Sequence, residues 1–140
     1  RRLARVLRGA LTLRWPGGES VRIHARHDFK GHSQYNKTHG HQKAALWDGW
    51  GDVYVAGHRH EGASAVDEFH DGRIRWRIRA RGYKVVDDYA RSRQFYDHQH
   101  GHSVATLLDP YAKHPAQRVI PVYDLEEAAD WLAFLRRRRS

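Results

Sequence analysis

The 140-residue sequence contains no cysteine. This absence excludes disulfide bonds, thiolate metal sites and a cysteine nucleophile, and it leaves the compartment undecided. No apolar run approaches the roughly 20 residues of a membrane-spanning helix, and no signal-peptide pattern precedes the first predicted strand. We therefore expect a soluble cytoplasmic protein without a membrane partner. The chain begins with Arg1 instead of methionine, so we expect that a preceding segment was removed or lies outside this sequence.

Charge and histidine content are the features that the sequence has in excess. The net charge is +9 and the pI is about 10.2, which favours an anionic partner such as nucleic acid or a phosphorylated substrate. The 12 histidines are scattered through the chain, and several lie in loops that contain glycine. Hydrophobic residues make up 40% of the chain, which is enough to pack one domain, and no linker or repeat divides it.

The first residues have helical periodicity. Apolar side chains recur at helical spacing at Leu3, Val6, Leu7, Ala10 and Leu11. This pattern predicts a basic amphipathic helix of about three turns that packs on the core and exposes its arginines. Nucleic-acid binding by this helix is the less favoured alternative.

A strand, helix, strand pattern follows. Residues 11–15 and 20–26 flank a Pro-Gly-Gly turn and predict a hairpin. A helix over residues 42–47, with Thr38 as N-cap, precedes a short buried strand over residues 53–56. A strand, helix, strand unit has parallel strands, so both strands end at the same edge of the sheet. In the strand before the helix, His24 is expected to face solvent.

Residues 63–70 and 73–81 predict a second hairpin around Asp71 and Gly72. In its second strand, alternate positions are apolar and expected inward, and the arginines between them are expected outward. Those arginines are Arg73, Arg75, Arg77, Arg79 and Arg81. Two interpretations are equally favoured: the arginines track nucleic-acid phosphates, or they protect a solvated edge strand.

The remaining segments predict a short helix near residues 87–93, extended segments over 104–110 and 118–123, and a last helix. Asp124 and Glu127 have the spacing of a capping box at the start of that helix. Three histidines at alternate positions precede the strand at 104–110. We interpret His98, His100 and His102 as a surface cluster, with metal chelation as the alternative.

Two histidines follow the strand at 53–56. His58 and His60 are one residue apart, so their imidazoles project to the same side of an extended chain. His27 ends the strand that the helix connects to this one, so all three are expected at one sheet edge. Imidazole is a common ligand for Zn, Mn, Fe and Ni, which makes His27, His58 and His60 candidate metal ligands. The alternative for His58 and His60 is a structural turn with hydrogen-bonded histidines, and the flanking glycines and the strand before them favour the metal. No aspartate follows an apolar strand in an Asp-x-His or Gly-Asp pattern.

These motifs resemble the last two metal motifs of the calcineurin-like metallophosphoesterases, namely a lone histidine after a strand and a Gly-His-x-His turn. Residues 26–33, 38–40, 82–84, 87–90 and 108–110 also look like a phage-type branch of that superfamily. The resemblance implies an α/β fold, the C-terminal half of a metallophosphoesterase α/β/β/α sandwich with a mixed sheet, hairpins and flanking helices. Residues 1–140 would then be the C-terminal portion of one truncated domain.

The resemblance further implies a hydrolase that cleaves phosphomonoesters or phosphodiesters with a metal-bound hydroxide at a site of two divalent ions, Mn, Zn or Fe. His27 and His58 would bind one metal and His60 the other. The family's Asp-x-His, bridging aspartate and Gly-Asn-His motifs have no counterpart here. We therefore expect these 140 residues alone to be inactive or nearly so, with no catalytic residue other than His39 as a candidate.

Substrate contacts are expected from His39, Lys30 and Arg59, and Lys37 is a further phosphate-contact candidate. The substrate would be a phosphoester, with nucleic acid and nucleotides among the options. His32 and His41 are expected to face solvent. The competing hypothesis is a non-catalytic basic module in which the arginine-rich strand and the two terminal segments bind nucleic acid.

Overall fold

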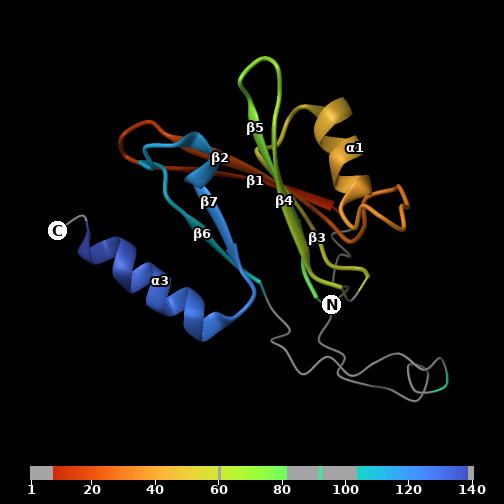
Figure 1. The fold of residues 1–140 in the computed structure, drawn as a ribbon. Coiled ribbons are helices and arrows are strands. Elements are labelled where there is room, and N and C mark those ends of the chain that lie inside the picture. The colour runs from red at the N-terminus through yellow and green to blue at the C-terminus, as the bar shows by residue number, and fades with distance from the viewer. Residues whose placement is uncertain (1–7, 60, 82–91, 93–103, 139–140) are drawn as a thin grey trace, which may run out of the picture.

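The structure is a computed structural model that describes residues 8–59, 61–81, 92 and 104–138. Five strands form its main sheet: β1 (Arg8–Arg14), β2 (Ser20–Arg26), β3 (Val53–Ala56), β4 (Ala63–Glu68) and β5 (Ile74–Arg79). Their order across the sheet is β1-β2-β3-β5-β4 (Figure 1). The three inner strands β2, β3 and β5 are parallel, and both outer strands pair antiparallel with their neighbours.

Two helices and a small second sheet complete the described fold. Helix α1 (His39–Asp48) connects β2 to β3 and packs on β3 and β5. Strands β6 (Ala105–Leu108) and β7 (Val119–Val122) pair antiparallel, and the short 3-10 helix η1 (Pro115–Gln117) lies between them. Helix α3 (Leu125–Arg137) packs on β6 and β7, on the other side of the strands from α1 (Figure 1). The prediction of an α/β fold with a mixed sheet is confirmed.

The first strand corrects the predicted helix. Residues 8–14 pair with all seven residues of β2 in an antiparallel hairpin, so the helical prediction is wrong for residues 8–11. Residues 1–7 lie outside the described part of the chain. The turn at Pro16–Gly18 is as predicted, and Gly18 has a φ of 93° there. Strand pairing outweighs the local helical period because it gives hydrogen-bonded partners along the whole segment.

Helix α1 covers one face of the main sheet. Phe29, Ala45, Tyr54 and Ala56 form the core of this interface. His24 points into it: its ring lies 5.5 Å from both the Phe29 and the Tyr54 ring, and only 9% of the residue is exposed. The expectation that His24 faces solvent is therefore wrong. The alternation of faces along β2 is correct, but a helix, and not water, covers the second face.

The β6–β7 sheet covers the opposite face. Val119 of β7 packs with Val21, Val53, Trp76 and Ile78 of the main sheet. The indole of Trp76 also donates a hydrogen bond to the Ala116 carbonyl, at 3.2 Å. The described layers therefore run helix, five-stranded sheet, two-stranded sheet, helix. Burial of both faces explains why β3 is a short continuous apolar run.

The last helix begins as predicted. The Asp124 carboxylate accepts a hydrogen bond from the Glu127 amide at 2.8 Å, which is the predicted N-cap. Along this helix Ala128 is buried, whereas Leu125 and Leu132 are 58% and 39% exposed. Within the described residues, no helix is long and apolar enough to cross a membrane. The helix predicted near residues 87–93 lies outside the described part, apart from Ser92.

Strand β5 lies inside the sheet, between β3 and β4. The predicted hairpin with β4 is confirmed, but the interpretation of β5 as an edge strand is wrong. Its arginines are also not outward on a solvated surface, because Arg75, Arg77 and Arg79 are only 4%, 6% and 7% exposed. They lie on the face that α1 covers. In these positions the three arginines do not form an exposed surface that could contact the phosphates of a nucleic acid.

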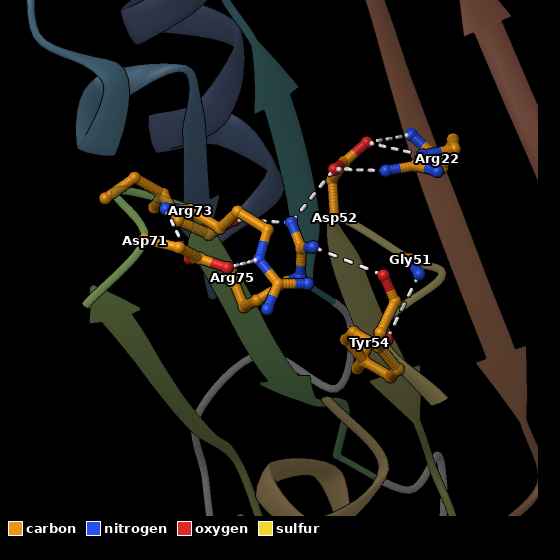
Figure 2. Close-up of polar contacts among 9 residues, drawn as sticks. Arg22, Gly51, Asp52, Tyr54, Asp71, Arg73 and Arg75 are labelled. Atoms are coloured by element: carbon orange, nitrogen blue, oxygen red, sulfur yellow. Dashed lines mark hydrogen bonds and ion pairs between the residues drawn. The ribbon is translucent and has the colours of Figure 1, made fainter. Parts of the chain in front are cut away.

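Asp52, just before β3, compensates the charge of Arg75 and also that of Arg22 on β2. Its carboxylate accepts hydrogen bonds from the Arg22 amide at 2.8 Å and from the Arg75 guanidinium at 3.2 Å (Figure 2). The Arg22 side chain also reaches it, at 3.4 Å. Arg75 further donates to the Gly49 carbonyl at 3.3 Å. Asp52 thus connects β2, β3 and β5 at the edge where the parallel strands begin.

Replacing Asp52 tests this connection. We expect Asp52→Asn to lower the free energy of unfolding by roughly 2–4 kcal/mol, because a buried Arg75 loses its compensating charge. Asp71→Asn is the matched control, since Asp71 pairs with Arg73 on the exposed hairpin, where ion pairs contribute little. Urea denaturation measures both variants. An equal loss for the two would show that the Asp52 ion pairs do not stabilise the sheet.

Candidate metal centre

Three parallel strands end at one edge of the main sheet. β2 ends at Arg26, β3 at Ala56 and β5 at Arg79, and all three run in the same direction. α1 begins after the loop that follows β2, and its first turn packs on that loop: a Cβ on Gly40 would lie 2.2 Å from the Phe29 carbonyl oxygen. The first turn of α1 therefore lies at this edge too. The carboxyl ends of parallel strands are where α/β sheets bind ligands.

His27 and His58 meet at this edge. The His27 Nε2 and His58 Nδ1 atoms are 2.7 Å apart, and the ring centroids are 4.5 Å apart. One nitrogen carries the hydrogen and donates it to the other, and the tautomer decides which. Both residues are exposed, so solvent reaches the pair. The predicted convergence of these two side chains is confirmed.

The geometry of the pair fits half of a metal-ligand set. Two imidazole nitrogens bound to one tetrahedral metal at about 2.0–2.1 Å stand about 3.3–3.4 Å apart. The observed 2.7 Å is shorter, so a metal would replace the shared hydrogen and separate the rings slightly. Exposed side chains on two loop positions can make that shift at little cost.

Further ligands do not come from the described residues. No group of three or more His, Asp or Glu side chains in the described ranges is arranged to hold a metal. His60, the third predicted ligand, and the cluster of His98, His100 and His102 all lie outside those ranges. Two imidazoles alone leave coordination positions open on any metal that binds here.

The carboxylates and cations near the pair are already in contact with one another. Asp28, next to His27, lies 4.0 Å from the Arg59 guanidinium. Glu61 lies 2.7 Å from the Lys37 ammonium and 3.7 Å from the Arg79 guanidinium. Arg59, predicted as a substrate contact, is thus placed beside the histidines.

The other predicted contacts lie further along the same loop. His39 is the first residue of α1 and is half-buried; a Cβ on Gly31 would lie 3.2 Å from its ring. Lys30 and His32 are exposed, and for His32 this is as predicted. Among the described residues, neither His39 nor Lys30 has a hydrogen bond to the histidine pair.

His41 is a buried residue of the site that the sequence interpretation placed in solvent. It is 2% exposed and packs against the Phe29 ring at 4.8 Å, and its Nε2 atom has no hydrogen-bond partner in the described structure. Burial, and then the charge of Arg79, lower the pKa of His41 from 6.5 to about 4. Its spacing of four from buried Ala45 was the signal that could have identified it.

Comparisons of the chain with protein-family models, with curated proteins and with solved structures found no match. The metal centre is therefore inferred from the residues and their geometry.

Metal titration tests the histidine pair. We expect the chain to bind Zn²⁺ or Mn²⁺, and we expect His27→Ala and His58→Ala each to weaken the affinity by more than about tenfold, because each removes a ligand. His70→Ala is the control, since His70 lies exposed in the β4–β5 hairpin at the other end of β5. Isothermal titration calorimetry measures the affinities. Equal affinities for all three variants would contradict a site at the pair.

A pH titration of stability tests the burial of His41. The folded pKa lies below the unfolded value of 6.5, so the unfolded state takes up the proton first as the pH falls. Stability is therefore lost between pH 6.5 and about 4, by roughly 3 kcal/mol from this residue. We expect His41→Phe to lose less stability over this range than the wild type does, and His32→Phe to behave as the wild type. Chemical denaturation at several pH values measures the difference, and parallel curves for wild type and His41→Phe would contradict it.

Proposed function

We propose that this chain carries part of the active site of a metal-dependent phosphoesterase of the calcineurin-like type, corresponding to the C-terminal half of that fold. The observation that carries the proposal is the 2.7 Å approach of His27 Nε2 and His58 Nδ1. The two residues come from separate parallel strands joined by a helix. His58, the first histidine of the Gly-His-x-His motif, and the lone histidine after a strand are thus next to each other in space.

His27 and His58 would hold one divalent metal, and such a metal supplies a Lewis acid that polarises a phosphoryl oxygen and activates water. The protein's own contribution is to place the two imidazoles directly after the ends of two adjacent strands of a packed sheet. The β2–β3 and β3–β5 hydrogen bonds hold the strand ends in register. This rigidity limits the reorganisation that ligand binding requires.

The charges at the edge favour a phosphoester as the ligand. Arg59, Lys37 and Arg79 are the cations there, and Asp28 and Glu61 are the carboxylates paired with them. Guanidinium and ammonium groups stabilise the negative charge of phosphoryl oxygens. The net charge of +9 also attracts anionic substrates over longer distances.

The alternative, a nucleic-acid-binding module without catalysis, has less support. It relied on exposed arginines along β5, and three of these, Arg75, Arg77 and Arg79, are buried. The first segment, where described, is a strand and not a basic helix. Arg136 and Arg137 at the end of α3 are exposed.

The proposed function predicts a link between metal and phosphate. We expect inorganic phosphate to bind the 140-residue chain more tightly in Mn²⁺ than in EDTA, because a bound metal ion can coordinate an oxygen of the phosphate. The gain is expected to disappear in His58→Ala and to persist in His70→Ala. Calorimetry with and without Mn²⁺ measures it, and phosphate affinity that is independent of Mn²⁺ would contradict the proposal.

Catalysis by these 140 residues is expected to stay at or near the background for a nitrophenyl phosphodiester in Mn²⁺. The chain contains none of the aspartate and asparagine motifs that would complete a two-metal site. Robust turnover that His58→Ala abolishes would support the phosphoesterase class, but it would contradict the view that the site is partial.

A further inference from the structure

The three buried arginines of β5 differ in how their charges are compensated. Arg75 donates to the Asp52 carboxylate at 3.2 Å and to the Gly49 carbonyl at 3.3 Å. Arg77 donates to the Thr38 hydroxyl at 2.6 Å and to the Asp67 carboxylate at 2.7 Å. Both guanidinium groups therefore have hydrogen-bonded partners that explain their burial.

Arg79 lacks such partners. The residue is 7% exposed, yet among the described residues its guanidinium makes no hydrogen bond. Its one ion pair there is the 3.7 Å contact with Glu61, whose side chain is 51% exposed. A largely buried guanidinium with one long ion pair contributes less to the stability of the sheet than the hydrogen-bonded Arg75 and Arg77 do, and it keeps capacity to bind an anion.

The surroundings of Arg79 combine a second guanidinium with the carboxylates of Glu61 and Asp28, which offset part of the positive charge. Burial, and then the nearby Arg59 guanidinium, lower the pKa of Arg79. His41, on the helix above, is neutral at ordinary pH because its own pKa is about 4. Arg59 has only a 4.0 Å contact with Asp28. Two adjacent guanidinium groups with long, incomplete ion pairs form a place where an anion would be stabilised.

The backbone of Arg79 lies at the sheet edge where His27 and His58 meet. Arg79 is the partner of Ala56 in the parallel β3–β5 pairing, two residues before His58. Its carbonyl accepts a hydrogen bond from the Tyr123 hydroxyl at 3.2 Å, and it also pairs with Ala63 of β4. Three neighbouring segments thus fix this residue, which is the preorganisation that a binding group needs.

We propose that Arg79 and Arg59 form a phosphoryl-binding subsite next to the His27–His58 pair, and that the Glu61 carboxylate occupies this subsite when no anion is bound. The assignment of the bound anion as the phosphoryl group of the substrate rests on the proposed function. The subsite itself depends only on the arginines. Lys37, 2.7 Å from Glu61, holds the displaced carboxylate when the anion enters.

Phosphate titration in EDTA tests the subsite without any contribution from metal. We expect Arg79→Gln to weaken the binding of inorganic phosphate by at least about tenfold, because it removes charge-assisted hydrogen bonds. Glu61→Gln is expected to strengthen binding, since it removes the competing carboxylate. Arg73→Gln is the matched control: it removes the same charge from the exposed hairpin before β5 and is expected to leave affinity unchanged. Phosphorus NMR titration measures all four proteins.

Thermal unfolding separates binding from a structural role. We expect Arg79→Gln to unfold at the wild-type temperature or above, because it removes an incompletely compensated buried charge, and we expect Arg77→Gln to unfold at a lower temperature. Equal phosphate affinity in Arg79→Gln and Arg73→Gln would overturn the proposal. If Arg79→Gln does not fold, unchanged affinity in Glu61→Gln also overturns it.

The two proposals fail separately. Phosphate binding in EDTA that depends on Arg79, together with no metal binding at His27 and His58, would support the subsite and contradict the phosphoesterase function. Metal binding at the histidines with no phosphate affinity in EDTA would overturn the subsite and leave the phosphoesterase proposal standing.

Discussion

The parallel pairing of β2, β3 and β5 is the constraint on which the site depends. Parallel strands end at the same edge, so residues that directly follow β2 and β3 are placed together, although 31 positions separate His27 from His58. The hydrogen bond between these imidazoles is a consequence of that pairing. The same pairing places Arg79, at the end of β5, beside the last residue of β3.

The face of the sheet under α1 is an unusual mixture of aromatic packing and buried charge. Asp52 compensates Arg75 at the amino end of the parallel strands, and Asp67 compensates Arg77 at their centre. These pairs fix the strands relative to one another. Toward the carboxyl end the compensation weakens, and Arg79 retains only a long contact with Glu61. A protein gains binding energy for anions at such a place, at a cost in folding stability. Under the proposed function, Arg75 and Arg77 of this strand stabilise the sheet and Arg79 binds an anion.

Much of this edge could be predicted from the sequence because short-range patterns determine it. The apolar run before Gly57 and the strand, helix, strand order were enough to bring His27 and His58 together. Alternation along β2 and β5 gave the correct faces, but it could not reveal that α1 covers the second face, which is why His24, His41 and the arginines were misplaced. Likewise, the helical period of residues 3–11 competes with a pairing to β2 that only the tertiary fold provides. The position of β5 inside the sheet depends on its pairing with β3, which is distant in the sequence, and no local pattern predicts that pairing.

The central claim is that His27 and His58 are ligands of one metal ion. X-ray absorption spectroscopy of the zinc-loaded chain tests it most directly, because imidazole ligands give a characteristic scattering pattern. The account predicts at least two imidazole nitrogens at about 2.0–2.1 Å from the metal, with one fewer in His27→Ala and in His58→Ala. A spectrum without imidazole scattering, or one that neither substitution changes, would contradict it.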